Sequence, residues 1–273
     1  MTENLPMRRM NDWFCGTRAT VALATLIPGD PALAAAAANS VSDLKDLCSR
    51  GNFGACVNLG IYYDTGQQVE QDSAKASTFY LKACNGKFAP GCHNLAVLYD
   101  NGRGVAQDKA KAAEFYGKAC DGGHLAACAN LAILNSNGAG VAKDKAKAAA
   151  LFEKACDGKI ATSCFNLGSL YMTGDGIAKD LAKSATFYGK ACDAGYLQGC
   201  ANLGVLYDNG SGIPQDKAKA AELYGKACDA GNKEGCFNLA VYYANGKGGL
   251  QDKDKAKEFY AKACTLGYQP ACK

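Results

Sequence analysis

The sequence has few of the residues and motifs on which several protein functions depend. It contains two His residues in 273 positions, whereas zinc-dependent hydrolases generally need several His ligands around their metal. Its formal net charge is +4, from 30 basic and 26 acidic residues, which is too weak and too mixed for binding to a nucleic-acid backbone. A glycine-rich phosphate loop of the Walker type is also missing from the sequence. We therefore expect no nucleic-acid partner, no metal and no cofactor.

Long apolar runs are also absent from most of the chain. No run of 18 or more apolar residues lies after residue 40, so the mature chain is expected to have no membrane span. The first forty residues differ, because basic residues precede an apolar run, ATVALATLI, and an alanine-rich stretch with cleavage options from Ala34 to Ala38. This pattern is typical of an export signal, which we assign to residues 1–38, with residues 39–273 forming the folded body. A disordered leader is the alternative, because three acidic residues are unusual in such a signal: Glu3, Asp12 and Asp30.

Cysteine, in contrast, is abundant, and its count supports the cleavage. The chain has 15 Cys residues, and cleavage between Ala34 and Ala38 would remove only Cys15. Fourteen Cys residues would remain, an even number, as a fully paired protein of an oxidising compartment requires. We therefore expect an exported protein, either periplasmic or secreted.

These fourteen Cys residues fall into two columns when the sequence is written with a period of 36. The first column is Cys48, Cys84, Cys120, Cys156, Cys192, Cys228 and Cys264, and the second is Cys56, Cys92, Cys128, Cys164, Cys200, Cys236 and Cys272. Two residues after the second column lies an Asn column, made of Asn58, Asn94, Asn130, Asn166, Asn202 and Asn238. A period between 20 and 50 residues predicts a tandem array of supersecondary units, that is, a solenoid.

Each unit is expected to contain two helices, as the segment CANLGVLYDNGSGIPQDKAKAAELYGKAC illustrates for residues 200–228. Apolar residues lie at helical spacing on both sides of a glycine-rich loop. Gly210 and Gly212 are expected to end the first helix, and Asp216 is expected to cap the second. An aromatic column would fill the core between units: Tyr80, Tyr116, Phe152, Tyr188, Tyr224 and Tyr260. The sequence therefore predicts an all-α solenoid of six helical hairpins after an opening half-helix at Val41 to Arg50.

The two Cys columns are placed to face each other across a turn. In the segment GKACDAGYLQGC, Cys192 lies in the last turn of one helix, Gly195 reverses the chain, and Cys200 lies in the first turn of the next, antiparallel helix. We predict a disulfide in every such pair, from Cys48 with Cys56 to Cys264 with Cys272. Each would close a loop of about nine residues and stabilise the fold by roughly 2 to 3 kcal/mol. A metal site is the alternative, but zinc fingers have about two to four residues between paired Cys, fewer than here.

The unit NLGVLYDNGSGIPQDKAKAAELYGKACDAG resembles the Sel1-like repeat, a relative of the tetratricopeptide repeat. With a Cys pair in every unit, the chain is similar to the secreted cysteine-rich Sel1-like proteins first described from Helicobacter, over residues 44–273. The resemblance implies a right-handed superhelix of disulfide-clamped hairpins, secretion, and binding of proteins or peptides. It also implies β-lactam binding with weak hydrolysis as an alternative function. A mitochondrial assembly factor of cytochrome c oxidase has the same repeat type, but the leader of this chain lacks the Arg-rich, acid-poor character of a transit peptide.

A serine β-lactamase needs an activated serine, commonly in a Ser-x-x-Lys motif, together with Ser-Asp-Asn and Lys-Thr-Gly elements. The sequence has one Ser-x-x-Lys match, from Ser42 to Lys45, and no Lys-Thr-Gly. A match this loose arises by chance, and Ser42 is expected to cap the opening half-helix instead. We therefore predict no catalytic residue, and we expect any β-lactam hydrolysis to be slow and insensitive to Ser42→Ala.

The Asn column is the predicted ligand-binding surface. In tetratricopeptide relatives the first helix of each hairpin lines the concave face, where an Asn amide can both donate and accept hydrogen bonds. The alternative is a structural Asn that bonds to the preceding turn, which is common near helix starts. Specificity is expected from side chains that vary between units, namely His93, Phe165, Met172 and Phe237. We expect a monomeric scaffold that binds a protein or peptide along a concave groove.

Overall fold

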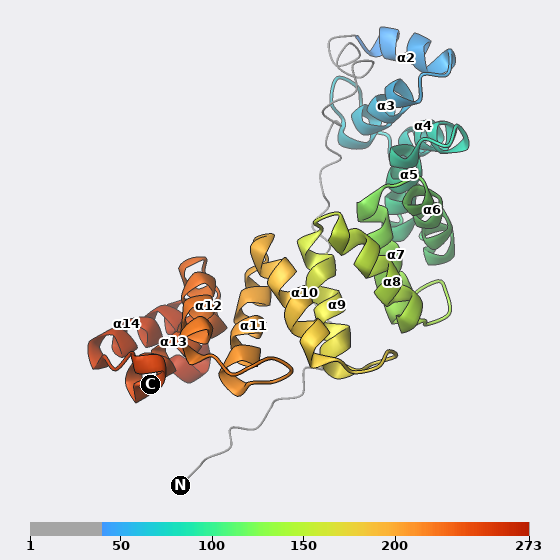
Figure 1. Ribbon diagram of the computed structural model, residues 1–273. Coiled ribbons are helices and arrows are strands. Elements are labelled where there is room, and N and C mark those ends of the chain that lie inside the picture. Colours follow the sequence, from blue (N-terminus) through green and yellow to red (C-terminus); the bar gives the residue numbers. More distant parts are fainter. Residues whose placement is uncertain (1–39, 273) are drawn as a thin grey trace.

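The computed structural model describes residues 40–272 and has the form of an all-α solenoid (Figure 1). Within this range there are thirteen α-helices and no strand. The opening half-helix is α2 (Val41–Ser49), and six hairpins follow it. They are α3 (Phe53–Thr65) with α4 (Ser73–Asn85), α5 (Ala89–Asn101) with α6 (Lys109–Asp121), α7 (Leu125–Asn137) with α8 (Lys145–Asp157), α9 (Ala161–Thr173) with α10 (Leu181–Asp193), α11 (Leu197–Asn209) with α12 (Lys217–Asp229), and α13 (Lys233–Asn245) with α14 (Lys253–Thr265). Two short 3₁₀ helices, η2 (Lys247–Gly249) and η3 (Gln269–Ala271), complete the array. The predicted fold class, an all-α solenoid, is therefore confirmed.

The helices begin and end at the residues that the repeat predicts. The odd-numbered helices from α3 to α13 end at a glycine of positive φ, for example Gly210 at 65°, a conformation that costs glycine little. The even-numbered helices from α4 to α14 begin after an aspartate, as α12 does after Asp216, whose carboxylate accepts a hydrogen bond from the Lys219 N–H. The other capping aspartates are Asp72, Asp108, Asp144, Asp180 and Asp252. Each cap stabilises its helix by about 1 kcal/mol.

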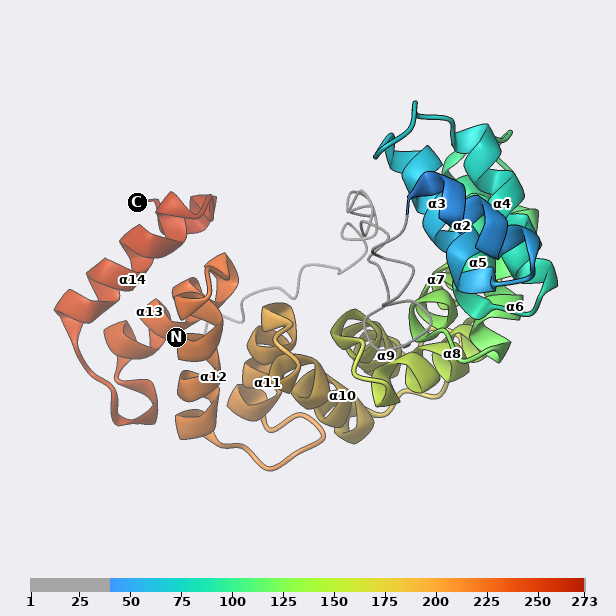
Figure 2. The ribbon, with the colours of Figure 1, turned by 90° about the horizontal axis from the view of Figure 1, so that it is seen from above.

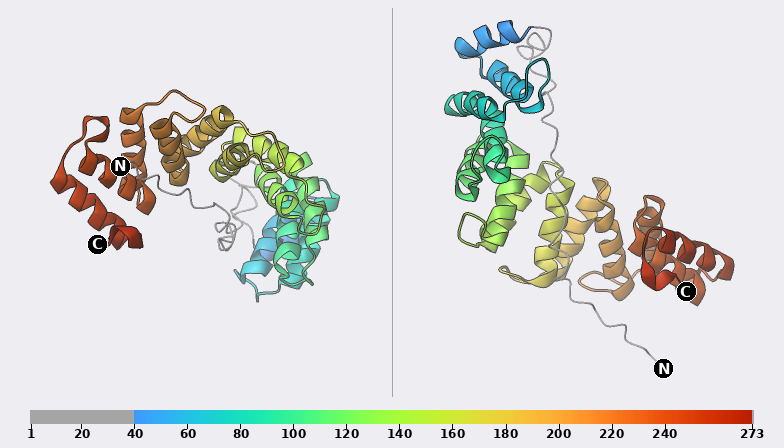
Figure 3. Two further views of the ribbon diagram at one scale, coloured as in Figure 1. Left: turned by 90° about the horizontal axis from the view of Figure 1, so that it is seen from below. Right: turned by 180° about the vertical axis from the view of Figure 1, so that it is seen from behind.

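The hairpins stack side by side into an arc (Figure 2). Every helix from α2 to α14 contacts the helix that follows it in the sequence, so the array is continuous. From α3 to α12 the odd-numbered helices lie nearer the inside of the arc and the even-numbered helices lie nearer its outside (Figure 2). Further views show the same progression from the blue N-terminal hairpins to the red C-terminal ones (Figure 3). The first helix of each hairpin therefore lines the inner face.

The core is built from the aromatic column and a column of small residues opposite it. The rings of Tyr80, Tyr116 and Tyr188 are at most 2% exposed. A Cβ atom added to Gly60 would lie 2.3 Å from the ring of Tyr80, so the absence of a side chain lets the two helices of one hairpin close on the ring. The aromatic column thus packs within each hairpin. It also packs between hairpins, as Tyr188 does against Leu206 of α11.

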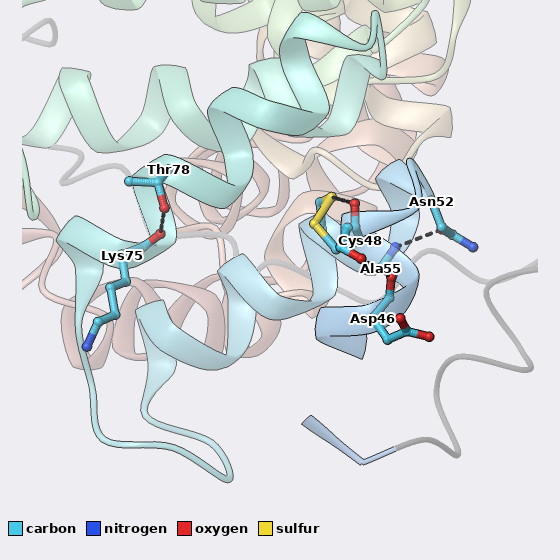
Figure 4. The surroundings of a disulfide bond; sticks show 8 residues. Asp46, Cys48, Asn52, Ala55, Lys75 and Thr78 are labelled. Atoms are coloured by element: carbon cyan, nitrogen blue, oxygen red, sulfur yellow. Dashed lines mark hydrogen bonds between the residues drawn. A yellow bond between two sulfur atoms is a disulfide. The ribbon is translucent and has the colours of Figure 1, made fainter. Parts of the chain in front are cut away.

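Seven disulfides form with the predicted connectivity, from Cys48 with Cys56 to Cys264 with Cys272. The paired Cα atoms are 4.4 to 4.9 Å apart. Five of the disulfides, from Cys84–Cys92 to Cys228–Cys236, join the second helix of one hairpin to the first helix of the next and so fasten neighbouring repeats to each other. Cys48–Cys56 joins α2 to α3, and Cys264–Cys272 joins α14 to the residue after η3. Figure 4 shows the Cys48 pair beside Asn52, whose side chain accepts a hydrogen bond from the Ala55 N–H at 3.0 Å.

The structure tests the predicted opening half-helix but does not test the predicted leader. The opening half-helix is present as predicted, with Arg50 as its C-cap. The predicted leader, residues 1–38, lies outside the described residues and stays a prediction. Among residues 40–272, no helix has the length and apolar character needed to cross a membrane.

Candidate binding face

Three columns of residues lie on the side of the odd-numbered helices that faces away from the even-numbered helices. In α5 they are Asn94, Val97 and Asn101, at helical spacing and opposite the buried Cys92 and Leu95. Because the odd-numbered helices form the inner side of the arc, these columns face its inside (Figure 2). We call them the inner stripe: Asn58, Asn94, Asn130, Asn166, Asn202 and Asn238, then Ile61, Val97, Ile133, Ser169, Val205 and Val241, then Thr65, Asn101, Asn137, Thr173, Asn209 and Asn245.

The inner stripe contains no charged residue. Its aliphatic column is open to solvent in the middle of the array, where Ile133 is 42% exposed and Val205 is 37% exposed. Amide and hydroxyl groups flank these aliphatic residues on both sides, so the surface offers hydrogen-bond donors, acceptors and apolar contact, but no ion pair. The backbone of an extended polypeptide needs the same combination from a surface that binds it.

Most charged residues of the hairpins lie on the even-numbered helices, and several of their Lys side chains contact aromatic rings or carboxylates of neighbouring helices. Lys111 Nζ lies 5.2 Å from the ring centroid of Tyr99, and this ring stacks on Phe115 at 5.7 Å. Lys190 pairs with Asp157 of the preceding hairpin at 3.0 Å. The same stacked pair with a Lys over its Tyr ring recurs at Tyr63, Tyr171 and Tyr243. These cations therefore support the fold rather than the inner face.

The fold brings the six predicted Asn residues to corresponding places on α3 to α13. Five of them are half-buried, and Asn58 is 3% exposed. Within the described part of the chain, only Asn202 has a side-chain hydrogen bond to the preceding turn, where its Oδ1 accepts from Gln198 Nε2 at 3.5 Å. The side chain of Asn130 lies by the buried hydroxyl of Tyr116. Asn58 is therefore buried from a ligand, the other five Asn side chains are partly accessible, and the role of the column stays a prediction.

Buried Tyr hydroxyls lie beside carboxylates at the ends of odd-numbered helices, an arrangement that the sequence analysis missed. The Asp100 carboxylate lies beside the Tyr116 hydroxyl, and its Oδ1 accepts from Lys109 Nζ at 2.5 Å. Burial raises the pKa of Tyr116, and the negative charge of Asp100 raises it further. Asp64 and Asp208 occupy the same column in two other hairpins. The partial Asp column was visible in the sequence, but linking it to the Tyr column requires knowing how the two helices face each other.

His93 and His124 differ in repeat position, and the fold brings them together at the joint between α5 and α7. Their rings stack with centroids 4.2 Å apart. Burial lowers the pKa of His93 to about 3, and the neighbouring His124 acts in the same direction. Burial also lowers the pKa of His124. Two repeats later the corresponding positions hold Phe165 and Tyr196, with centroids 5.0 Å apart, so the His pair occupies the place of an aromatic joint.

Ser42 and Lys45 lie on the exposed surface of α2. The prediction that Ser42 caps this helix is wrong, because the cap is Ser40. The Ser40 hydroxyl accepts a hydrogen bond from the Asp43 N–H at 3.2 Å, and the Asp43 carboxylate accepts one from the Ser40 N–H at 3.0 Å. An exposed serine lacks the oriented base and oxyanion donors that acyl transfer needs. Residues 40–272 also contain no group of three or more His, Cys, Asp or Glu placed to hold a metal ion.

Two hollows in the surface lie away from the inner stripe. One, of about 390 Å³, lies between α12 and the last hairpin, with Leu239, Tyr243 and Phe259 in its lining. The other, of about 650 Å³, lies at the C-terminal end beside Phe237 and Tyr260. Neither of the two is lined by an inner-stripe residue. A ligand of the inner stripe would therefore lie along a surface, as an extended segment does.

The repeats match a known family. The model of the Sel1 repeat matches six consecutive segments, residues 54–88, 89–124, 125–159, 161–196, 197–232 and 233–268. Each segment contains one hairpin and the Cys pair columns at its ends. No curated protein matches the chain.

Two solved structures share the fold, and a third matches part of the chain. A protective antigen present in uropathogenic Escherichia coli strains, which displays an SLR fold, is 29% identical with a TM-score of 0.81 over 85% of this chain, and this chain spans 50% of the antigen's length. A Sel1 repeat protein from Oxalobacter formigenes is 26% identical with a TM-score of 0.66, and the match covers 83% of this chain and 99% of that one. Helicobacter pylori cysteine rich protein B is 34% identical with a TM-score of 0.40, and the match covers 48% of this chain and 93% of that one.

Proposed function

The chain belongs to the Sel1 repeat family, and we propose that it is an exported scaffold whose inner face binds an extended segment of a protein or peptide. Sel1 repeat proteins generally mediate protein interactions, and the proposal assigns that interaction to one surface of this chain. The observation that carries it is the inner stripe, which is uncharged over six hairpins while the even-numbered helices carry Lys, Asp and Glu. A solenoid that used its charges for recognition would place them on the open face.

The spacing of the repeats favours an extended ligand. Equivalent residues recur at a regular interval along the solenoid, and an extended chain rises about 3.3 Å per residue. Successive hairpins would therefore meet the bound chain at regularly spaced residues. The Asn amides supply paired donors and acceptors for its backbone, and Val97, Ile133 and Val205 supply apolar contact for its side chains.

The test compares two exposed aliphatic residues on opposite faces. Ile133 of the inner stripe is 42% exposed, and Leu81 of the outer helix α4 is 41% exposed. The probe is a labelled peptide selected from a random twelve-residue phage library against the full chain. Ile133→Glu should weaken its binding by about tenfold or more, because the partner would bury an unpaired charge. Leu81→Glu should leave the affinity unchanged.

Two results would contradict the proposal. Equal affinities of the Ile133→Glu and Leu81→Glu variants would place the binding surface elsewhere, and failure to select any peptide would remove the scaffold function itself. Salt provides a further check, since a contact without ion pairs is little affected by screening. The affinity should change less than about twofold between low and high salt.

Export is the second part of the proposal, and the Cys chemistry supports it. All fourteen Cys residues of the described chain are in disulfides, and such bonds persist in oxidising compartments. Expression of the full sequence, followed by fractionation and N-terminal sequencing, should find a mature chain that begins between residues 35 and 39 outside the cytoplasm. A full-length chain with free thiols in the cytoplasm would contradict export.

A further inference from the structure

All repeats have the same backbone conformation. A residue that differs from the others in its column can therefore be compared directly with its equivalents in the other hairpins. Hairpin α9/α10 departs in two columns that hold only Ile, Val or Ala in the five other hairpins, and a third buried serine, Ser163, stands in a column of Ala and Gly. Ser169 stands where the others have Ile61, Val97, Ile133, Val205 and Val241. Ser184 stands where the others have Ala76, Ala112, Ala148, Ala220 and Ala256. This hairpin therefore has two hydroxyls at positions where the fold requires none.

The buried Tyr188 of the same hairpin lacks the acceptor that its counterpart has. In hairpin α5/α6 the Asp100 carboxylate lies beside the Tyr116 hydroxyl, and the corresponding position of hairpin α9/α10 is Met172. Tyr188 and Ser184 are both 0% exposed. Neither hydroxyl has a hydrogen-bond partner within residues 40–272. Buried hydroxyls without partners destabilise a fold, and proteins keep such local defects mainly at functional sites.

Three polar side chains from three helices surround the Tyr188 hydroxyl, although none forms a well-aligned hydrogen bond with it. They are Ser169 of α9, Ser184 of α10 and Asn202 of α11. Burial raises the pKa of Tyr188, and these three neighbours act against that rise, as polar groups close to a hydroxyl do. Ser169 and Asn202 belong to the inner stripe and are half-buried, so the cluster reaches the inner face.

Met172 packs beside this cluster. Its side chain lies against the apolar residues around Tyr188 and is itself half-buried. Methionine is unbranched and has three rotatable bonds, so it adapts its shape at low cost. Because Tyr188 and Ser184 are 0% exposed, a ligand would reach them only if a neighbouring side chain such as Met172 changed its rotamer.

We propose that Ser169, Ser184, Tyr188 and Asn202 form a subsite for one uncharged carboxamide side chain, Asn or Gln, of the segment bound on the inner face. This inference rests on the proposed function of that face and adds one element of its specificity. The carboxamide oxygen accepts hydrogen bonds from the Tyr188 and Ser169 hydroxyls, and its NH₂ group donates to Asn202 Oδ1.

Other side chains fit the subsite less well. None of its four residues is charged, so a carboxylate or an ammonium group would lose its water without gaining an opposite charge. An aliphatic side chain would leave the Tyr188 and Ser169 hydroxyls without the acceptor that a carboxamide offers, as a site built for hydrogen bonding does when it receives an analogue without polar groups. A carboxamide satisfies both conditions, because it is neutral and has both a donor and an acceptor.

The test uses a random twelve-residue peptide library displayed on phage and selected against the full chain. Peptides that bind should share Asn or Gln at one position, and replacing that residue by Leu in a synthetic copy should weaken binding about tenfold. In the triple variant Ser169→Val, Ser184→Ala and Tyr188→Phe, which removes the three hydroxyls, the Leu copy should bind as well as the original. Tyr224→Phe, the same change one repeat later, is the matched control and should keep the preference.

The outcomes separate this inference from the scaffold function. Peptides without a shared Asn or Gln, or a preference that survives in the triple variant, would overturn the subsite and leave the scaffold standing, whereas an empty selection would overturn both. A second measurement needs no peptide. Because these hydroxyls serve the ligand, the double variant Ser169→Val and Ser184→Ala should melt at the wild-type temperature or above it. A decrease of about 5 °C or more would show that they serve the fold, and would overturn the subsite.

Discussion

Hairpins α5/α6 and α9/α10 lie two repeats apart and share the features that hold the solenoid together. A disulfide joins each of them to the preceding repeat, Cys84–Cys92 in one and Cys156–Cys164 in the other. Each has an aspartate cap on its second helix, and each stacks a Tyr on a Phe with centroids 5.7 Å apart. The two hairpins are therefore built in the same way.

Their polar residues near the core are different. In α5/α6 the Tyr116 hydroxyl has the Asp100 carboxylate beside it, whereas in α9/α10 the Tyr188 hydroxyl is unpaired and Met172 takes the place of the carboxylate. The joint that follows is a His pair in the first case and a Phe–Tyr pair in the second. The comparison teaches that caps, turns and disulfides fix the shape of a repeat. The residues that vary on this common frame show what each repeat does in addition.

The largest expected effect tests the common frame. Replacing Cys84 and Cys92 by Ser, or Cys156 and Cys164 by Ser, opens a loop of about nine residues and should lower the free energy of unfolding by about 2 to 3 kcal/mol in either case. Urea unfolding of both double variants beside the wild type measures the loss. A large loss in one repeat and none in the other would mean that the two hairpins do not depend on the same frame.

The next largest effect concerns two aromatic contacts between hairpins, His93 with His124 and Phe165 with Tyr196. Acid should weaken only the His pair. The pKa of His93 is about 3 in the fold against an ordinary value of 6.5, so the neutral form is the one that packs. Its contribution to stability is complete above about pH 6.5 and falls as the pH decreases below that value, with about 2 kcal/mol lost by pH 5. The lowered pKa of His124 adds to the loss in the same direction.

Urea unfolding between pH 7 and pH 5 checks this effect, with a variant that copies the other joint as its control. His93→Phe with His124→Tyr reproduces the pair Phe165 and Tyr196, and it should remove most of the pH dependence in this range. A variant that kept the wild-type slope would show that other groups cause the loss, and the two joints would then not differ in their response to acid.

Removal of the Tyr116 or the Tyr188 hydroxyl should have a smaller effect on stability, and the effect should differ between the two. Tyr116→Phe should lower the free energy of unfolding by about 1 kcal/mol, because it takes a donor from the Asp100 carboxylate. Tyr188→Phe should leave the free energy of unfolding unchanged or raise it, because its hydroxyl has no partner in the described chain. Thermal unfolding of both variants decides the matter, and equal losses would mean that the two hydroxyls have the same role.

The smallest effect distinguishes binding from support in the Asn column. Asn130→Ala and Asn166→Ala should each reduce the affinity for a selected peptide by about 1 kcal/mol, which makes the double variant roughly tenfold weaker or more, while the melting temperature stays the same. Titration with the peptide and a melting curve measure the two quantities. A lower melting temperature with unchanged affinity would assign these residues to support of the fold.

The fold was predictable from the sequence because it repeats. Gly210, Asp216 and the Cys pairs indicate helix ends and turns through local conformational preferences. The same residues recur in the other repeats, so each repeat supports the prediction made for the others. The cap of α2 was the exception. Ser40 and Ser42 both lie at the start of this helix, and the capping box of Ser40 with Asp43 is the signal that distinguishes them.

The site was less predictable, because its contacts join different helices. His93 and His124 stack although they differ in repeat position, and nothing in a repeat column indicates such a pair. The Asp100 and Tyr116 contact depends in the same way on how far each helix is rotated about its axis. What the columns did contain was the list of exceptions, including Ser169, Ser184 and Met172, and these acquire a meaning only once the surrounding residues are placed.

The disulfides between repeats also determine how the molecule would respond to a pulling force. Each bridge joins Cys residues eight positions apart in a repeat of 36 residues, so tension along the chain passes through sulfur and bypasses the turn. A repeat drawn out fully would measure about 120 Å. The bridge withholds roughly 22 Å of this length, because it replaces eight residue steps of about 3.3 Å by a Cα–Cα distance of 4.5 Å. The oxidised array is therefore a shorter tether than the reduced one, and its maximum reach is set by covalent bonds at every joint.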